Sequence, residues 1–99
     1  MQRRLAAILA ADVVGYSARM GEDEAATLAA LRALRAEVLG PTVAACGGRV
    51  VKSLGDGWLV EFPAAADAVA CAMQVQDRLD APGGLRLRIG VHLGDVTHE

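Results

Sequence analysis

The sequence is organised around a glycine–aspartate–glycine turn near its middle. Two short runs rich in β-branched and aromatic residues, Arg49 to Leu54 and Trp58 to Phe62, flank Gly55-Asp56-Gly57. An Asp-Gly pair between two such runs is a strong local signal for a β-hairpin, because these residues tolerate the backbone angles of tight hairpin turns. A central antiparallel hairpin restricts the rest of the chain, since the flanking segments must extend or cover its sheet.

The segment before the hairpin predicts a strand followed by a helix. Leu5 to Val14 is apolar except for Asp12, a pattern typical of a strand that is covered on both faces and central in its sheet. The acidic cluster Glu22-Asp23-Glu24 marks a helix start, where carboxylates favour the positive end of the helix dipole. We expect this helix to end near Gly40-Pro41, with a short helical turn to Ala45 after it. Its core stripe consists of Leu28, Leu31, Leu34 and Val38.

The segment after the hairpin repeats the pattern in reverse, with a helix and then a strand. We expect the helix to begin at Pro63 and to end before Pro82-Gly83-Gly84, with Ala68, Ala72, Val75 and Leu79 on its core side. The final run alternates apolar and polar or small residues, so it predicts an edge-like strand with one wet face. The apolar positions of this run are Leu85, Leu87, Ile89 and Val91, and Arg86, Arg88 and Gly90 alternate with them.

These elements occur in the order β-α-β-β-α-β, which predicts an α+β fold of the ferredoxin-like (split βαβ) type in one domain, residues 1–99. Right-handed crossovers place the first strand beside the third in a four-stranded antiparallel sheet with both helices on one face. The end of the first strand then lies about 4.8 Å, one strand spacing, from the start of the third. Asp12 and Asp56 occupy those two ends.

Two carboxylates at adjacent strand ends repel each other unless a cation or a proton lies between them. Magnesium is a suitable cation, because it takes one or two protein carboxylates and completes its shell with water and substrate phosphates. The Gly15-Tyr16-Ser17 turn directly after Asp12 could hold phosphate oxygens through backbone N–H groups. The alternatives are that Asp56 is a plain turn residue, that Asp12 is structural, and that the Gly15 turn holds no ligand.

Lys52 is the only lysine of the chain and lies inside the first strand of the hairpin, where lysine is disfavoured. Either it is a solvated residue of an edge strand, or it is a point-charge donor directed at a ring nitrogen or a phosphate.

Charge and composition exclude several classes of protein. Ten basic and twelve acidic residues give a net charge of −2, so the chain has no basic field for nucleic acid or an anionic membrane. The apolar stretch Leu5 to Ala11 is too short for a membrane span, which needs about 20 residues, and lacks the cleavage site of an export signal. A cytoplasmic protein is expected, with Cys46 and Cys71 as small buried thiols and His92 as a strand residue.

Three segments together resemble the catalytic domain of class III adenylate/guanylate cyclases, in the bacterial adenylate cyclase branch. They run from Leu9 to Ser17 (LAADVVGYS), from Val51 to Trp58 (VKSLGDGW) and from Arg88 to Gly94 (RIGVHLG). The motifs occur in the order and spacing of the family over nearly the whole chain.

The resemblance implies conversion of ATP to 3′,5′-cyclic AMP and pyrophosphate with two Mg²⁺ ions, or Mn²⁺ in their place. By the family pattern, Asp12 and Asp56 bind the metals and Val13 adds its backbone carbonyl. Gly15-Tyr16-Ser17 matches the phosphate-holding loop, and Lys52 matches the lysine that reads adenine from the partner subunit. The family acts as a head-to-tail dimer, so a homodimer is expected for the complete domain.

The resemblance also has a limit. Family domains continue through a segment with a second adenine-reading aspartate and the asparagine and arginine that stabilise the transition state, and this sequence contains no such segment. We therefore expect a fragment of a cyclase domain that lacks the asparagine and arginine that stabilise the transition state. Loss of one transition-state donor costs on the order of 10²–10³ in rate, so the 99 residues alone should be nearly inactive.

Two other functions compete with this interpretation. A diguanylate cyclase would carry an acidic pair after Gly47-Gly48, where this chain has Arg49-Val50. A non-catalytic ferredoxin-like module that binds a nucleotide or a regulator remains the alternative, and magnesium-dependent binding of ATP would distinguish it from a cyclase.

Overall fold

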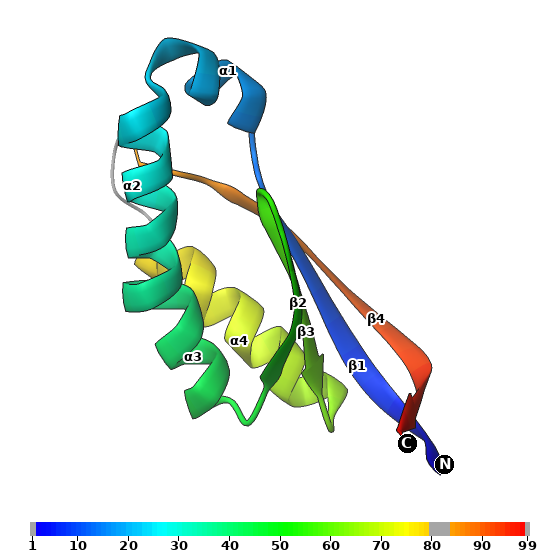
Figure 1. The fold of residues 1–99 in the computed structure, drawn as a ribbon. Helices are drawn as coiled ribbons and strands as arrows, with labels where there is room; N and C mark the ends of the chain where they lie inside the picture. Colours follow the sequence, from blue (N-terminus) through cyan, green and yellow to red (C-terminus); the bar gives the residue numbers. More distant parts are fainter. Residues whose placement is uncertain (1, 80–83, 99) are drawn as a thin grey trace.

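Four antiparallel strands form one sheet in the computed structural model, which describes residues 2–79 and 84–98 (Figure 1). The strands lie in the order β2-β3-β1-β4, so β1 is central and β4 forms one edge. This arrangement confirms the predicted ferredoxin-like topology, including the antiparallel pairing of β1 with β3. The strands are β1 (Gln2–Val13), β2 (Arg49–Leu54), β3 (Gly57–Phe62) and β4 (Leu87–His98).

The main helices pack on the same side of this sheet (Figure 1). A short helix, α1 (Tyr16–Glu22), follows β1 directly. Next comes α2 (Glu24–Leu34), which begins where the acidic cluster predicted, with Asp23 as N-cap accepting a hydrogen bond from the Ala26 N–H at 3.0 Å. The chain continues through the π-helical turn η1 (Arg35–Leu39) and α3 (Gly40–Ala45), and α4 (Ala65–Arg78) connects β3 to β4.

The prediction that a helix ends near Gly40-Pro41 is wrong, because α2, η1 and α3 form one continuous helical rod. Leu39 and Gly40 both have right-handed helical backbone angles. A proline inside an α-helix lacks one N–H and its ring clashes with the carbonyl four residues earlier. Here the preceding turn is widened, with the Gly40 N–H bonded to the Arg35 carbonyl. Pro41 therefore lies in the first turn of α3, which begins at Gly40, and does not interrupt the rod.

The prediction that the first strand is covered on both faces is also wrong. Alternate residues of β1 from Ala7 to Val13 are buried against the helices, whereas Ala10 is exposed and Ile8 and Asp12 are only half-buried. The helices of the described chain cover one face of the sheet and leave the other, which we call the open face, without a helical layer (Figure 1).

The helix predicted from Pro63 begins two residues later, at Ala65, and Ala64 forms its extended N-cap. The predicted stop before Pro82 concerns residues 80–83, which lie outside the described residues. The edge position of the last strand is confirmed, and its alternation holds from Leu85 to Arg88, where the leucines are buried and the arginines are exposed. It weakens further along the strand, because Ile89 is only half-buried and Val91 is exposed.

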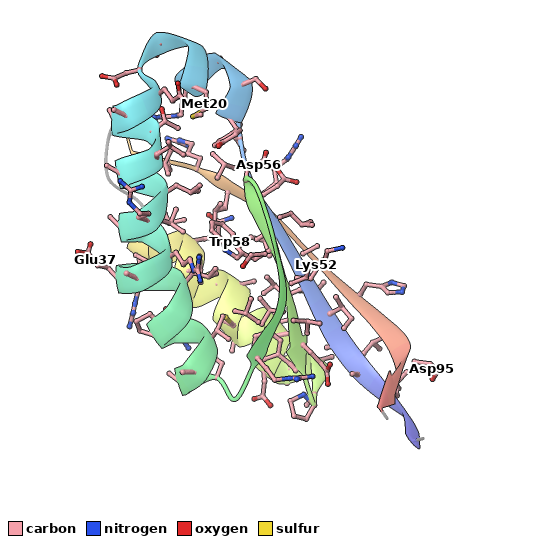
Figure 2. All side chains as sticks on the ribbon, viewed as in Figure 1. Met20, Glu37, Lys52, Asp56, Trp58 and Asp95 are labelled. Carbon is pink, nitrogen blue, oxygen red and sulfur yellow. The ribbon has the colours of Figure 1, made fainter. Side chains whose placement is uncertain are left out.

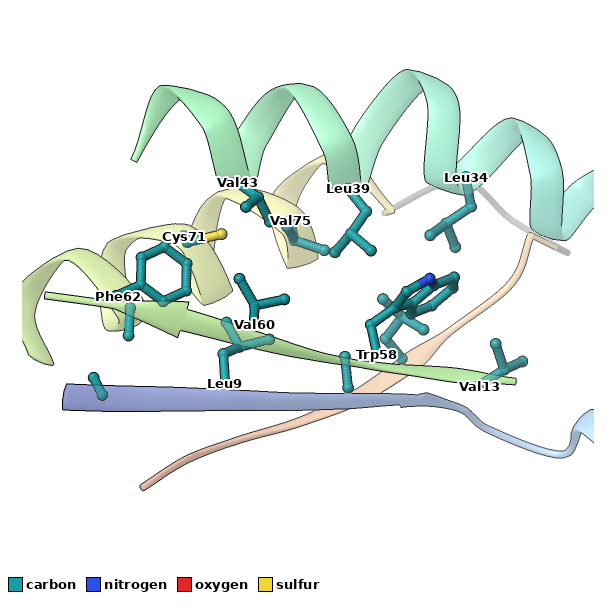
Figure 3. Close-up of a cluster of buried hydrophobic side chains, with 14 of the residues drawn as sticks. Leu9, Val13, Leu34, Leu39, Val43, Trp58, Val60, Phe62, Cys71 and Val75 are labelled. Carbon is teal, nitrogen blue, oxygen red and sulfur yellow. The ribbon is translucent and has the colours of Figure 1, made fainter. Parts of the chain in front are cut away.

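The core lies between the sheet and the helical rod (Figure 3). Trp58, Val60 and Phe62 are buried and point into it from β3. Within the described residues, none of the helices combines the length and apolar character needed to cross a bilayer.

Candidate functional site

The ends of β1 and β3 that carry the two aspartates lie side by side. Asp12 is the register partner of Gly57, and the Val13 N–H donates a hydrogen bond to the Asp56 carbonyl at 2.9 Å. Gly57 permits this close approach, because a Cβ at that position would lie 2.6 Å from the Ala11 carbonyl oxygen. The backbone thus brings the two residues together at the tip of the hairpin, where Asp56 is seen in Figure 2.

The carboxylate of Asp12 is held by an arginine that the sequence did not single out. Arg88 Nε and Nη2 each lie 3.0 Å from Asp12 Oδ1. The two side chains are 75% and 47% exposed, so this ion pair lies at the surface and is worth about 0.2–1 kcal/mol. The alternation of the last strand already indicated that Arg88 is exposed. Its pairing with Asp12 depends on the register between β1 and β4, in which the two residues are opposite each other.

The donors at this corner suit a hard divalent cation. Asp12 and Asp56 are both half-buried, which leaves their carboxylates accessible from solvent. Two carboxylates and nearby backbone carbonyls supply oxygen ligands only, and Mg²⁺ commonly binds through one or two protein carboxylates. Among the described residues there is no cluster of three or more His, Cys, Asp or Glu side chains that could hold a metal. The donor set therefore fits Mg²⁺ that is also held by water or phosphate, and does not fit a closed all-protein site.

The predicted phosphate loop is a turn that leads from β1 into α1. Gly15 has φ 66° and ψ 30° and is the N-cap of α1, a left-handed conformation that favours glycine. Its carbonyl accepts the Arg19 N–H at 3.1 Å. Tyr16 packs against the core and Ser17 is exposed. The first N–H groups of a helix have no intrahelical partner, so this turn offers free donors next to the Asp12 corner.

Lys52 lies on the open face of the sheet, away from the helices (Figure 2). An irregularity between Val50 and Lys52 makes Lys52 the partner of Leu59, and Leu59 pairs with Ala10 of β1. Lys52 is therefore two strand spacings from Ala10, and Asp12 lies two residues further along β1. The distance between the backbones of Lys52 and Asp12 is about 12 Å. Lys52 and Asp12 therefore share a face but do not contact each other.

Comparison with known proteins finds similarity to nucleotide cyclases. No family model matches the chain. The chain is 48% identical over its full length to the Rhizobium meliloti (strain 1021) protein named "Putative adenylate cyclase 3", of which it spans 18%. It is 40% identical to a solved adenylate/guanylate cyclase/hydrolase from Silicibacter pomeroyi, with a TM-score of 0.85 over 95% of this chain and 59% of that one.

A solved bacterial light-regulated adenylyl cyclase shares the fold, with a TM-score of 0.87 at 17% identity over 98% of this chain and 57% of that chain. The chain thus spans less than three fifths of these solved chains and about a fifth of the curated relative.

Proposed function

We propose that this chain carries the metal-binding corner of an adenylate cyclase, because it is similar over its full length to a putative adenylate cyclase and shares its fold with part of a solved adenylate/guanylate cyclase/hydrolase. The complete domain would convert ATP to 3′,5′-cyclic AMP and pyrophosphate. The observation that supports this most directly is the hydrogen bond between Val13 and Asp56, which joins the two aspartate-bearing strand ends.

In this proposal Asp12 and Asp56 hold the divalent ions, with the backbone carbonyl of Val13 as a further ligand. Bound there, Mg²⁺ would neutralise charge on the phosphates of ATP and on the attacking 3′ oxygen. The N–H groups of the turn at Gly15, Tyr16 and Ser17 would hold phosphate oxygens. Arg88 holds Asp12 at 3.0 Å, so it has to share or release that carboxylate when the metal binds.

Lys52 is proposed to act on a different nucleotide from the one bound near Asp12 of its own chain. The separation of about 12 Å along the open face keeps Lys52 out of contact with the metal corner of its own chain, and the family resemblance implies that it reads a base bound by the partner subunit. A homodimer with sites between subunits would let Lys52 of one chain approach the adenine bound by the other. An ammonium suits the lone pair of adenine N1 and is mismatched to guanine, whose N1 carries a hydrogen.

Metal binding by the 99-residue chain tests the site directly. We expect MnCl₂ with ATP to bind in calorimetric titration, and Asp12→Asn or Asp56→Asn to weaken binding by about tenfold or more, since even outer-shell partners of metals are worth 10–100-fold. Asp67→Asn is the matched control, because Asp67 is an exposed carboxylate in the first turn of α4. Equal affinities for MnCl₂ with ATP in the unmodified chain and in all three variants would refute the metal site.

Base selection needs the remainder of a catalytic domain. We propose that the 99 residues alone produce no measurable cyclic AMP, and that a chimaera with the corresponding remainder of the Silicibacter pomeroyi cyclase does. In that chimaera Lys52→Glu should lower kcat/KM for ATP relative to GTP by about ten- to a hundredfold, the cost of an unpaired polar group against the base. An unchanged ratio would assign Lys52 to the solvated edge of the sheet.

One observation favours a second candidate, a non-catalytic binding module. The ion pair with Arg88 already compensates the charge of Asp12, so a metal is not required to explain why a carboxylate ends this apolar strand. The module predicts nucleotide or regulator binding that does not depend on divalent ions, and the same titration without metal distinguishes it.

A further inference from the structure

A cleft opens between the helical rod and the hairpin of β2 and β3. Its main hollow has a volume of about 390 Å³, and a second hollow of about 230 Å³ shares Arg32, Arg35 and Trp58 with it. We call the two hollows together the rod cleft. Its size falls in the range of sites that hold small molecules. Neither Asp12 nor Asp56 lines it, so the rod cleft is separate from the candidate metal corner.

Two arginines of the rod border the cleft without a partner for their charge. Arg32 and Arg35 are three positions apart, so they share one face of the helix. Both are exposed, and neither guanidinium has an ion pair or hydrogen bond with any residue of 2–79 or 84–98. The nearest acid along the rod, Glu37, lies on the side away from the sheet (Figure 2). The rod cleft therefore carries two uncompensated positive charges.

The floor of the cleft contains a buried hydrogen-bond donor. Trp58 is only 3% exposed, and its indole nitrogen lies on the edge of the ring that faces the rod (Figure 3). Buried indole N–H groups usually donate a hydrogen bond. That of Trp58 has no acceptor in the part of the chain that the structure describes. Because Trp58 lines both hollows, an acceptor that enters the cleft can satisfy this N–H.

The remaining lining of the cleft is mostly apolar. On the side of β2, Val50 and Leu54 are 40% and 45% exposed, so they present apolar surface at the rim. The Ser53 hydroxyl is the one further polar side chain among the lining residues. A nucleotide would bring sugar hydroxyls and base nitrogens that find few partners here, and polar groups left imperfectly paired reduce affinity. The lining therefore suits a flat apolar body that carries one anionic group.

We propose that the rod cleft is a binding site for a small aromatic carboxylate. The ring system would lie against Leu39 and Val50, which line the main hollow. The carboxylate would accept hydrogen bonds from Arg32 and Arg35, because guanidinium groups match the two oxygens of a carboxylate. It would also give the Trp58 N–H its missing acceptor. This binding needs no divalent ion, so it does not depend on the proposed metal corner.

The probe 2-naphthoate and its neutral analogue 2-naphthamide test the site on the full chain without divalent ions. Calorimetry should give naphthoate a Kd on the order of 1 mM, as expected for a ligand of this size. The amide lacks the charge and should bind about tenfold more weakly, and so should adenosine monophosphate. The chain has one tryptophan, so the indole N–H signal in the NMR spectrum reports on Trp58 and should shift as naphthoate binds.

Arg32→Gln and Arg35→Gln should each weaken naphthoate binding by about two- to fivefold, as is typical of an exposed ion pair, and the double variant by about tenfold. Arg86→Gln is the matched control, because Arg86 is exposed and lines a different hollow. The proposal is overturned if naphthoate does not bind at about 10 mM, or if the amide or the nucleotide binds as tightly. An indole signal that stays in place during binding, or a double variant with the affinity of Arg86→Gln, overturns it equally.

Discussion

Replacement of Gly57 by alanine should disturb both the stability of the sheet and the aspartate corner. A Cβ at this position would lie 2.6 Å from the Ala11 carbonyl oxygen and 3.4 Å from Asp12 Cβ. The first contact involves backbone, so β1 and β3 must separate until it reaches at least 3.0 Å. Overpacking of this kind costs about 1–3 kcal/mol. For a domain of this size that lowers Tm by roughly 5–20 °C.

Gly55→Ala is the matched control, because Gly55 belongs to the same turn and a Cβ there would have nothing within 4 Å. Its φ is not positive, so alanine should be neutral or should stabilise the fold by about 0.4–1 kcal/mol through the unfolded state. Urea denaturation of the two variants measures the difference, and Mn²⁺ titration shows whether the corner is displaced. Equal free energies of unfolding for Gly57→Ala and Gly55→Ala would refute the close approach of the Ala11 carbonyl as the reason for a glycine at position 57.

Three further results are expected. Arg88→Ala should tighten Mn²⁺ binding by about two- to fivefold, since it removes a surface ion pair that competes for Asp12; an unchanged Kd in calorimetry would show that Arg88 does not compete. Asp23→Ala removes the acceptor of the Ala26 N–H and should cost about 1 kcal/mol of unfolding free energy in urea, and an unaltered midpoint would contradict the capping role. The pKa of Cys71 rises from 9.0 to about 11 on folding, so the stability that the neutral thiol contributes is complete below pH 9 and is lost as the pH rises toward 11. This loss of unfolding free energy, roughly 1–3 kcal/mol, should not occur in Cys71→Ala when thermal unfolding is measured as a function of pH.

The strand order could be predicted because its signals are local. The Asp-Gly turn specifies the hairpin, alternation identifies the last strand, and the handedness of crossovers then leaves one arrangement of the sheet. The same logic predicted that Asp12 and Asp56 occupy neighbouring strand ends, and the hydrogen bond from Val13 to Asp56 agrees with that placement.

The remaining features depend on contacts between distant segments. An apolar run such as Leu5 to Val14 looks the same whether helices cover one face of its strand or both. The partner of Asp12 is fixed by pairing with a strand whose Arg88 lies 76 positions away.

The widened turn at Arg35–Leu39 also limits how this chain can change by insertion and deletion. A π-helical turn is equivalent to an α-helix with one extra residue, so deletion of the exposed Ala36 would restore a regular helix while α2 and α3 keep their core-facing sides. Pro41 would then lie in the interior of an ordinary α-helix, at a cost of about 3 kcal/mol. Deletion of Ala36 together with Pro41→Ala would avoid that cost. The extra residue and the proline are therefore expected to be gained or lost together as homologous chains diverge.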